Sequence, residues 1–277
     1  MSSPFKHVVI ALVVVFGCTL ARASQPPLRV CADPNNMPFS NMREEGFENM
    51  LARMVAHDLH RDMQFVWWPQ RARFVEKWLK AQTCDLVMGI NPSSDLVTTT
   101  KPYYRSTYVF VSKRSRNLDP NSLTDATLQK YRIGAQIIGD EGESVPPAQE
   151  LAKRGMVRNI VGYSLYGQHP LAENPSAEII TAVAHGDVDL AVAWGPMAAY
   201  FARQSSVPLR VTAICPSTDR SAVPLAFDVS MGVRRGDDLL RDQLNTIIDR
   251  RRKEIDGLLR SYGVPLLEGT QARPECH

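Results

Sequence analysis

The 277-residue sequence predicts an α/β protein of two lobes, each built on a mixed β-sheet flanked by helices. Short apolar segments with strand character alternate with amphipathic helical segments along most of the chain, which is typical of mainly parallel sheets. Two extended apolar segments, at 107–113 and 224–233, divide this alternation, so that the chain crosses between the lobes twice. We therefore expect residues 24–110 and 224–277 to form one lobe and residues 111–223 the other.

The N-terminus has the pattern of a secretory leader. Lys6 precedes the apolar run Val8–Leu20, and Ala-Arg-Ala follows as a cleavage site that ends at Ala23. The apolar run is shorter than the roughly 20 residues that a membrane anchor needs, and no later segment is apolar for long enough to span a bilayer. These features predict a periplasmic protein with a cleaved signal peptide. Two alternatives are an uncleaved signal anchor and lipidation at Cys18, which requires a small residue where Phe16 stands.

Removal of residues 1–23 leaves a chain with 30 basic and 29 acidic side chains, and therefore with almost no net charge. It has no block of Lys and Arg with interleaved aromatic residues. The run Arg250–Lys253 has acidic neighbours in a helical pattern, which indicates a solvated helix face. Nucleic acid is therefore not expected as a partner.

The first half of the chain predicts alternating strands and helices. Phe47, Leu51 and Val55 recur at helical spacing and define one apolar face. The elements expected in this half are strands at 28–32, 63–68 and 84–90, and helices at 46–60 and 74–82.

The alternation begins again after Lys113. Asn174 and Pro175 predict a helix with a capping residue and a proline in its first turn, and Gly186 ends it. The expected strands are 131–136, 160–164, 188–194 and 209–214, and the expected helices are 145–155, 174–186, 195–204 and a long final helix at 239–259.

Four cysteines follow the leader, an even number that indicates two disulfides in an exported protein, with three possible pairings. Cys31 lies in the first strand and Cys84 opens the strand at 84–90, whereas Cys215 follows the strand at 209–214 and Cys276 lies in the C-terminal tail. This placement predicts the pairs Cys31–Cys84 and Cys215–Cys276. No Cys or His spacing indicates a metal site, and no cofactor is expected.

Several long stretches resemble one fold family. LRVCADPNNMPFSN, GFEN, TTTKPYYRSTYVFV and GDVDLAVAWGP resemble the type II periplasmic binding protein fold over nearly the whole mature chain. More narrowly, CADPNNMPFSN, FVWWPQRARFV and KPYYRSTYVFV with AWGP resemble the accessory proteins associated with quinoprotein methanol dehydrogenases, the MxaJ/XoxJ type. The resemblance implies a periplasmic, non-catalytic partner of a PQQ-dependent methanol dehydrogenase rather than a protein that supplies a transporter.

Amino-acid receptors of this fold are expected to hold the ligand carboxylate with an arginine about ten residues before the Pro-Tyr-Tyr turn. Here that region reads Pro92–Asp95, and the next basic residue is Lys101. Only Glu48 remains as an acid for the ligand's amino group. The amino-acid receptor interpretation is weakened, while a neutral or hydrophobic ligand in the cleft between the lobes stays possible.

Candidate cleft residues follow the first strand. Asp33, Asn35, Asn36 and Phe39 leave this strand at its carboxyl end, where loops of such folds face the ligand crevice. The alternative is a Pro/Asn turn whose side chains satisfy their own backbone, and both interpretations stay open.

Tryptophans supply further candidates. Trp67 and Trp68 point to opposite faces if both lie in a strand, and core packing is the favoured role for them, with Trp67 kept as a cleft candidate. Trp194 ends a buried strand, and Gly195-Pro196 forces a turn at the crevice. Trp194 is therefore a slightly stronger cleft candidate than Trp67.

Four more residues have open roles. Arg71 either meets an acidic partner surface or lies at a solvated helix start. Tyr103, Tyr104 and Arg105 come just before the first crossover, where they either respond to lobe closure or cap the hinge.

Catalysis requires a placed general acid or base, and the same fold hosts cyclic-acid dehydratases. Glu48, Asp33, His169 and His185 are the available groups, but no spacing brings them together, and nucleophile-elbow, metalloprotease and phosphate-loop motifs are absent. No catalytic residue is therefore assigned. The favoured function is a dehydrogenase accessory protein; the alternatives are a receptor for a small solute that is not an amino acid, and a dehydratase-like enzyme.

Overall fold

A computed structural model describes most of the chain after the leader. The described ranges are 25–69, 81–138, 143–165, 173–215 and 223–268. The expected signal peptide and most of the helix expected at 74–82 lie outside them.

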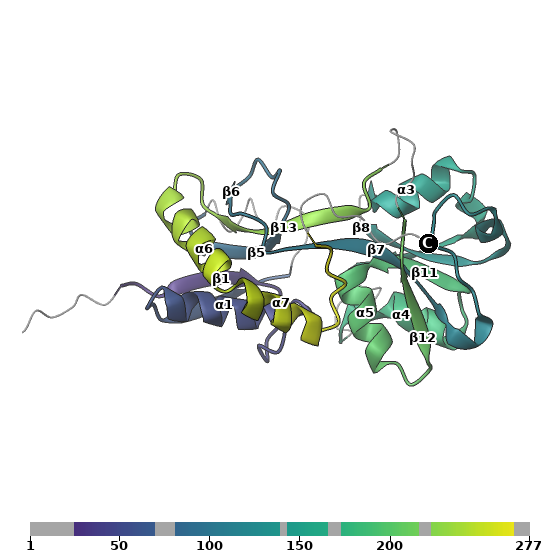
Figure 1. Ribbon diagram of the computed structural model, residues 1–277, viewed down its shortest axis with the longest axis horizontal. Coiled ribbons are helices and arrows are strands. Elements are labelled where there is room, and N and C mark those ends of the chain that lie inside the picture. Colours follow the sequence, from purple (N-terminus) through teal and green to yellow (C-terminus); the bar gives the residue numbers. More distant parts are fainter. Residues whose placement is uncertain (1–24, 70–80, 139–142, 166–172, 216–222, 269–277) are drawn as a thin grey trace, which may run out of the picture.

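Two lobes stand side by side and are joined by two long strands (Figure 1). Within the described residues, the strands form one 11-stranded mixed sheet, because the ladder is continuous through the joining strands. The predicted α/β class with mixed sheets and crossover strands is confirmed. The order across the sheet is β10 (Ile160–Ser164), β8 (Ile133–Ile138), β11 (Leu190–Trp194), β7 (Tyr104–Lys113), β13 (Ala226–Val233), β5 (Leu86–Ile90), β1 (Leu28–Ala32) and β4 (Met63–Trp67).

Shorter strands extend this framework. They are β12 (Leu209–Ala213), which pairs with β7; β6 (Thr98–Thr99), which pairs with β13; β9 (Glu143–Ser144), which pairs with β8; and the separate pair of β2 (Asn35–Asn36) and β3 (Ser40–Asn41).

Lobe 1, as we use the name, contains β1, β4 and β5, which are parallel, and three helices within its described residues. Leu28 and Val30 of β1 and Leu86 of β5 belong to one buried apolar cluster with residues of these helices. Val87 points to the other face, as strand alternation requires, and packs beside the disulfide cysteines. The helices are α1 (Phe47–Asp58), α6 (Asp238–Arg250) and α7 (Arg252–Ser261).

Lobe 2 contains the parallel strands β8, β10 and β11, with helices on both faces. Ala191 and Ala193 of β11 face one apolar cluster, while Leu190 and Val192 face the other. This buried apolar run matches the two-sided burial expected of a parallel strand. The helices are α3 (Pro146–Lys153), α4 (Glu178–His185) and α5 (Gly195–Gln204).

The joining strands β7 and β13 pair with each other in antiparallel register, from Ala226 opposite Thr107 to Val229 opposite Tyr104. They occupy the two extended segments that the sequence singled out as crossovers. Because both strands run through the junction, the lobe boundaries predicted near residues 110 and 224 fall within or beside them, and those boundaries stay a prediction.

Two helix expectations need correction. The expected final helix at 239–259 is interrupted at Arg251, so that α6 and α7 are separate helices. Asn174 adopts a left-handed conformation and its side chain caps nothing; a short 3-10 turn, Pro175–Ala177, leads into α4 instead. Gly186 does end α4, with φ of 92°.

The basic run at 250–253 is only partly a solvated face. Arg250 Nη2 and Arg251 Nη2 each lie 2.6 Å from a carboxylate oxygen of Asp58, at the end of α1. These ion pairs lower the pKa of Asp58. Arg252 donates to the carbonyl oxygen of Tyr103 at 2.9 Å, and thereby ties α7 to the start of β7. The run therefore links the final helices to α1 and to the crossover.

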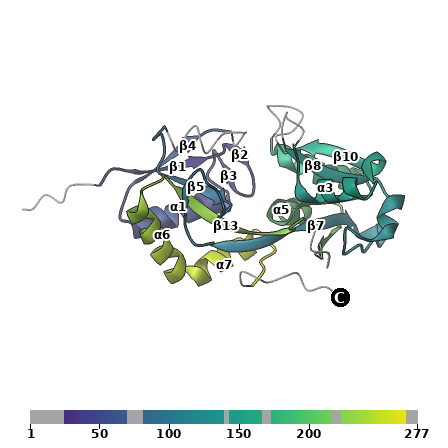
Figure 2. The same ribbon diagram turned by 90° about the horizontal axis from the view of Figure 1, so that it is seen from above.

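The lobes also touch away from the hinge strands. Met37, from the loop after β1, is buried in the apolar cluster of lobe 2. The backbone N–H of Asn174 donates to Asn35 Oδ1 at 3.0 Å, and Tyr262 stacks on Tyr200 with ring centroids 6.0 Å apart. Figure 2 shows α5 of lobe 2 at this junction, below β2 and β3 of lobe 1. These contacts hold the lobes together on one side of the cleft.

None of the helices in the described ranges combines the length and apolar character that a bilayer crossing requires. The predicted disulfide Cys31–Cys84 is present, with Cα atoms 5.6 Å apart. Cys215 is also disulfide-bonded. Cys276 lies outside the described residues, so the pairing Cys215–Cys276 stays a prediction.

The Cys31–Cys84 disulfide joins two residues that are 53 positions apart in the sequence. It therefore restricts the conformations of the unfolded chain between them. We expect the double variant Cys31→Ala/Cys84→Ala to lose about 2–4 kcal/mol of the free energy of unfolding, measured by urea denaturation. Mild reductant should destabilise wild type more than this variant. A variant within about 0.5 kcal/mol of wild type would contradict a stabilising role for this bond.

Candidate cleft site

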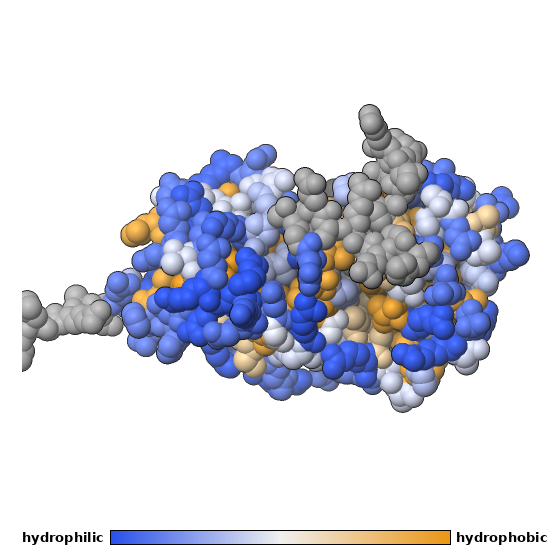
Figure 3. Space-filling model, in the orientation of Figure 1, coloured by the Kyte–Doolittle hydropathy of each residue, from blue (hydrophilic) through white to orange (hydrophobic). Residues whose placement is uncertain are grey.

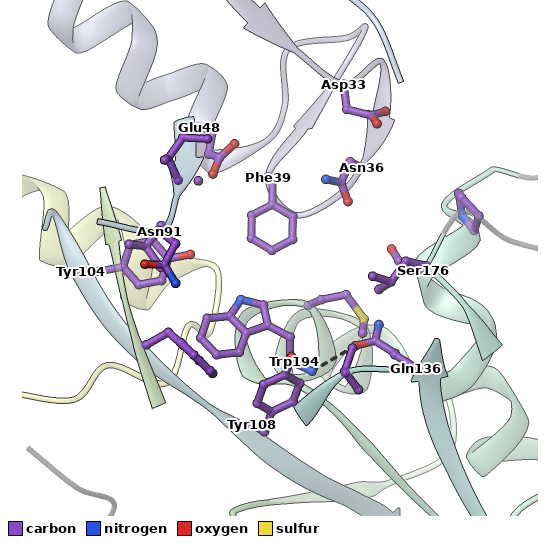
Figure 4. Close-up of a pocket in the computed structure, with 18 of the residues that line it drawn as sticks. Asp33, Asn36, Phe39, Glu48, Asn91, Tyr104, Tyr108, Gln136, Ser176 and Trp194 are labelled. Carbon is purple, nitrogen blue, oxygen red and sulfur yellow. Dashed lines mark hydrogen bonds between the residues drawn. The ribbon is translucent and has the colours of Figure 1, made fainter. Parts of the chain in front are cut away.

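A cavity of about 590 Å³ lies between the lobes, a size usual for small-molecule sites. Both lobes and both hinge strands line it, and Figure 4 shows their side chains converging on it. The lining residues used below are Asp33, Asn35, Asn36, Phe39, Glu48, Gly89 and Asn91 from lobe 1, Tyr104, Tyr108, Phe227 and Asp228 from the hinge strands, and Gln136, Ser176, Trp194 and Met197 from lobe 2.

The parallel strands explain why these residues meet. Asp33 follows β1 and Asn91 follows β5, while Trp194 is the last residue of β11. In each lobe, parallel strands bring their carboxyl ends to one edge, and the hinge strands place these two edges opposite each other. The cleft therefore collects the loops that leave the strands.

Aromatic side chains form one wall of the cavity. The Trp194 indole packs edge-on against Tyr108, with centroids 5.2 Å apart, and against Phe227 at 6.1 Å. Phe39, from lobe 1, lies across the cavity from Trp194 (Figure 4). A ligand with an apolar or planar body therefore finds matching surface here.

The start of α1 is set by close backbone contact with the preceding loop. The N–H groups of Phe47 and Glu48 donate to the carbonyl oxygens of Pro38 and Phe39, at 2.8 and 2.9 Å. Gly46 permits this approach, since a Cβ there would lie 2.0 Å from the carbonyl oxygen of Phe39. The sequence GFE therefore positions the Glu48 side chain at the cavity.

Glu48 is a buried acid with few hydrogen-bond donors around it in the described structure. Its side chain is 7% exposed, and the Tyr103 hydroxyl donates to Oε1 at 3.2 Å. Loss of hydration disfavours the charged form, so burial raises the pKa of Glu48 to about 7, although the Tyr103 hydrogen bond opposes the rise. Figure 4 shows the carboxyl group turned toward the cavity.

The residues beside Glu48 also pack closely. Gly89 has φ of 74°, and a Cβ there would stand 3.1 Å from Glu48 Oε1. The pKa values of Tyr103 and Tyr104 are raised, chiefly by burial and also by the charge of Glu48. The Trp194 side chain hydrogen-bonds to Tyr104 and partly offsets this shift. Both phenols therefore stay protonated at neutral pH.

Neutral polar groups occupy the lobe 2 side. Gln136 Oε1 accepts the backbone N–H of Trp194 at 3.3 Å, and its amide group lies at the cavity (Figure 4). Ser176 is 6% exposed, and its hydroxyl has no hydrogen-bond partner among the described residues. The described lobe 2 lining therefore offers hydrogen-bonding groups and no full positive charge.

Charge in the lining is acidic. Asp33, Glu48 and Asp228 carry carboxyl groups, and no Lys, Arg or His of the described chain is in the lining. Asp228 is paired with Arg105, at 3.1 Å, on the facing hinge strand. Within the described ranges, no group of three or more His, Cys, Asp and Glu is arranged to hold a metal ion.

A family model of bacterial extracellular solute-binding proteins, family 3, matches residues 28–264, which covers both lobes and both hinge strands. The chain belongs to this family. The type II periplasmic binding protein fold that the sequence resembled is thereby supported at the level of the whole described chain.

Relatives within this solute-binding family have names of the MoxJ, XoxJ and MxaJ type. Protein MoxJ of Methylorubrum extorquens is 33% identical over 261 residues, which make up 89% of this chain and 85% of that protein. The crystal structure of periplasmic binding protein XoxJ from Methylobacterium extorquens AM1 has a TM-score of 0.70 at 36% identity, and covers 87% of this chain and 100% of that chain.

A second crystal structure, MxaJ from Methlophaga aminisulfidivorans MPT, has a TM-score of 0.74 at 28% identity, and covers 87% of this chain and 100% of that chain. The predicted resemblance to the MxaJ/XoxJ type is therefore confirmed for both sequence and fold.

The structure brings most of the predicted site residues of this family member to one cavity. Asp33 Oδ1 also accepts the N–H of Asn35, at 2.8 Å, so Asp33 stabilises its own turn while it lines the cavity. The predicted residues that line the cavity are Asp33, Asn35, Asn36, Phe39, Glu48, Tyr104 and Trp194.

Three predicted candidates that the structure describes are not in this lining. Tyr103 is fully buried behind Glu48, and Arg105 pairs with Asp228 on the hinge. Trp67 packs on Phe65, with ring centroids 4.8 Å apart. Arg71 lies outside the described residues. Contact of any candidate with a ligand or partner stays a prediction.

Sequence reasoning missed several lining residues. Asn91 follows β5 at its carboxyl end, so the rule that identified Asp33 applies to it equally. Gln136 is a buried polar residue within an apolar strand, which is a usable signal. Tyr108, Met197 and Phe227 have no such signal, because large apolar residues are common in cores.

Glu48 gives a testable pH dependence of stability. In the folded chain its pKa is raised from an ordinary 4.5 to about 7, so between these values only the folded state retains the proton. The contribution of Glu48 to the free energy of unfolding therefore falls as pH rises through this window, by about 2–3 kcal/mol. We expect wild type to lose this much relative to Glu48→Gln in urea denaturation between pH 4.5 and 7.5.

Glu45→Gln is the matched control, because Glu45 is an exposed acid just before α1 and its pKa is lowered by Arg43. Its pH profile should parallel that of wild type over the same window. Parallel profiles for wild type and Glu48→Gln would contradict the assigned titration.

Proposed function

We propose that this protein is a periplasmic, non-catalytic accessory protein that binds a PQQ-dependent methanol dehydrogenase and assists its activation or maturation. The observation that carries the proposal is similarity to MoxJ and XoxJ at 33–36% identity over nearly nine-tenths of the chain. Such coverage includes both lobes, the hinge strands and the cleft, so the likeness extends beyond a shared core.

Export to the periplasm is part of this proposal. The leader pattern at residues 1–23, the extracellular solute-binding family and the Cys31–Cys84 disulfide support it, since structural disulfides form in oxidising compartments.

The cleft argues against an amino-acid receptor. A bound amino acid presents a carboxylate, which needs a cation or several donors, and the described lining supplies carboxyl groups instead. The cavity itself favours a second candidate function, a receptor for a small solute that is not an amino acid. Catalysis is not part of the proposal, because among the described residues Glu48 has one hydrogen bond, from Tyr103, and no neighbour in a defined acid-base role.

The surface offers an apolar contact near the cleft. Trp68 is 43% exposed, directly after β4, and the adjacent Pro69 lines the cavity. The backbone N–H of Trp68 donates to the carbonyl oxygen of Ala32, so Trp68 lies at the edge where the parallel strands end. Figure 3 shows hydrophilic residues over much of one face and hydrophobic residues near the junction of the lobes. Exposed tryptophans are frequent anchors of protein interfaces.

Purified residues 24–277 should retain purified methanol dehydrogenase on an affinity column. We expect saturable retention that is stronger for the cofactor-free enzyme, because an assistant of activation must act on the immature form. Trp68→Ser should weaken the apparent affinity about fivefold or more, since loss of an interface tryptophan commonly costs over 1 kcal/mol.

Leu239→Ser is the matched control. Leu239 is also an exposed apolar residue, 73% exposed, but lies at the start of α6, away from the cleft. Its variant should bind as wild type does. Absence of retention for both forms of the enzyme, together with a small molecule carried by the purified protein, would favour the solute receptor instead.

A further inference from the structure

Three aromatic side chains leave part of their ring surface uncovered in the cleft. Phe39 of lobe 1, Phe227 of hinge strand β13 and Trp194 of lobe 2 line the cavity, and each is only partly buried. Trp194, Phe227 and Tyr108 pack together as one group of rings, which we call the Trp194 wall, and Phe39 lies across the cavity from it (Figure 4). Covering apolar surface is favourable, and aromatic rings attract one another. The cavity therefore fits a flat aromatic group.

The acids of the described lining already have partners. Glu48 Oε1 accepts the Tyr103 hydroxyl at 3.2 Å, and Asp33 Oδ1 accepts a backbone N–H within its own turn at 2.8 Å. Asp228 is ion-paired with Arg105 at 3.1 Å. No Lys, Arg or His of the described chain is in the lining. A charge that is buried without a counter-charge costs free energy, so this lining favours an uncharged ligand over an anion or a cation.

Gln136 places a hydrogen-bond donor on the lobe 2 side of the cavity. It is 2% exposed, and its Oε1 accepts the backbone N–H of Trp194 at 3.3 Å. Because the carbonyl end of the amide is engaged, the NH₂ end, which only donates, is the end that serves a ligand. Ser176 also lines the cavity, and its buried hydroxyl has no partner among the described residues. One kind of ligand atom, an oxygen that accepts hydrogen bonds, suits both groups.

We propose that the cleft binds an uncharged aromatic compound that carries a carbonyl or hydroxyl oxygen. Its ring packs against the Trp194 wall, with Phe39 on the opposite side, and its oxygen accepts a hydrogen bond from the Gln136 amide. The cavity of about 590 Å³ has the size of a site for such a small molecule. This binding goes beyond the accessory function and does not depend on it.

Each part of this chemistry excludes a different kind of ligand. A carboxylate finds no cation in the described lining, and an ammonium group finds carboxyl groups that already have partners. A hydrocarbon supplies no acceptor for Gln136 and Ser176, and buried polar groups without partners cost free energy. A saturated ring covers the Trp194 wall but lacks the attraction between aromatic rings.

Calorimetric titration of the purified mature chain, residues 24–277, tests the ligand class with matched probes. Benzamide has a ring, a carbonyl oxygen and no charge; benzoate and benzylamine replace its amide by an anion and a cation; cyclohexanecarboxamide replaces its ring by a saturated one. At pH 6 most Glu48 carboxyl groups are protonated, because the pKa of Glu48 is about 7.

At this pH we expect benzamide to bind at least tenfold more tightly than benzoate, and at least threefold more tightly than benzylamine and cyclohexanecarboxamide. The order follows from the lack of a described cation in the lining, the engaged acids and the aromatic wall. Binding of any of the three as tight as that of benzamide would overturn the proposal.

Trp194→Leu tests the wall. It should weaken benzamide binding at least fivefold, and the preference for benzamide over cyclohexanecarboxamide should disappear, which a general folding defect would not cause. Tyr131→Leu is the control, because Tyr131 is a partly buried aromatic residue of lobe 2 just before β8, at the opposite end of the parallel strands from the cleft. It should bind within twofold of wild type. An unchanged preference in Trp194→Leu would overturn the assignment of the wall.

Gln136→Met tests the hydrogen bond. It should weaken benzamide binding at least fivefold, whereas fluorobenzene, a ring without a carbonyl or hydroxyl group, should bind the variant and wild type equally. Gln129→Met is the control, because Gln129 is exposed at the end of lobe 2 away from the cleft. It should leave both affinities within twofold of wild type. Equal benzamide affinities for Gln136→Met and wild type would overturn the assignment of Gln136.

The same ring and carbonyl group occur in a free aromatic compound and in an aromatic residue of a protein partner. N-acetyl-phenylalanine methylamide represents the second source. Tighter binding of benzamide identifies a free compound as the ligand, whereas tighter binding of the peptide analogue identifies a partner's side chain. Failure of both to bind overturns the proposal and leaves the accessory function intact.

The cofactor of the proposed partner enzyme is a sharper probe of charge, because PQQ is planar and aromatic but carries three carboxylates. It should bind at least tenfold more weakly than benzamide, since no cation of the described lining receives those carboxylates. Binding of PQQ as tight as that of benzamide would overturn the requirement for an uncharged ligand.

Discussion

The antiparallel pairing of β7 and β13 is the interaction on which the rest of the structure depends. The two strands run through the junction of the lobes and make one hydrogen-bonded sheet out of two sets of parallel strands. Their pairing sets the two carboxyl edges opposite each other, so the loops after β1 and β5 meet the end of β11. Tyr104 and Phe227, on the paired strands themselves, complete the floor of the resulting cavity.

A second set of contacts limits how the lobes can move. Met37 is buried among lobe 2 residues, and Tyr262 of lobe 1 stacks on Tyr200 of lobe 2. In a receptor, hinge closure brings the two lobes onto the solute. Here the lobes already share apolar contacts on one side, and separating them would expose those side chains to water. The cavity is therefore held in shape by protein contacts as well as by the hinge.

The site divides into residues that the sequence predicts and residues that it does not. Asp33 and Phe39 follow a strand, and Trp194 ends one, so strand polarity places all three at the cleft. Glu48 was predicted from its position at the start of a helix. Its burial was not, because that depends on the approach of Gly46 to Phe39 and of Gly89 to the carboxyl group. Gln136 and Ser176 come from segments that only the folded sheet brings near these residues.

By itself, the sequence determined the alternation of strands and helices, the two crossover segments, the Cys31–Cys84 pair and the absence of an arginine at Pro92–Asp95, because these follow from local pattern and residue chemistry. Tertiary structure decided three other features: the break between α6 and α7, the insertion of Met37 into lobe 2, and the burial of the Glu48 carboxyl group. Each of these depends on which distant atoms surround a residue, and burial and hydrogen-bond partners are set by packing across the chain rather than by local pattern.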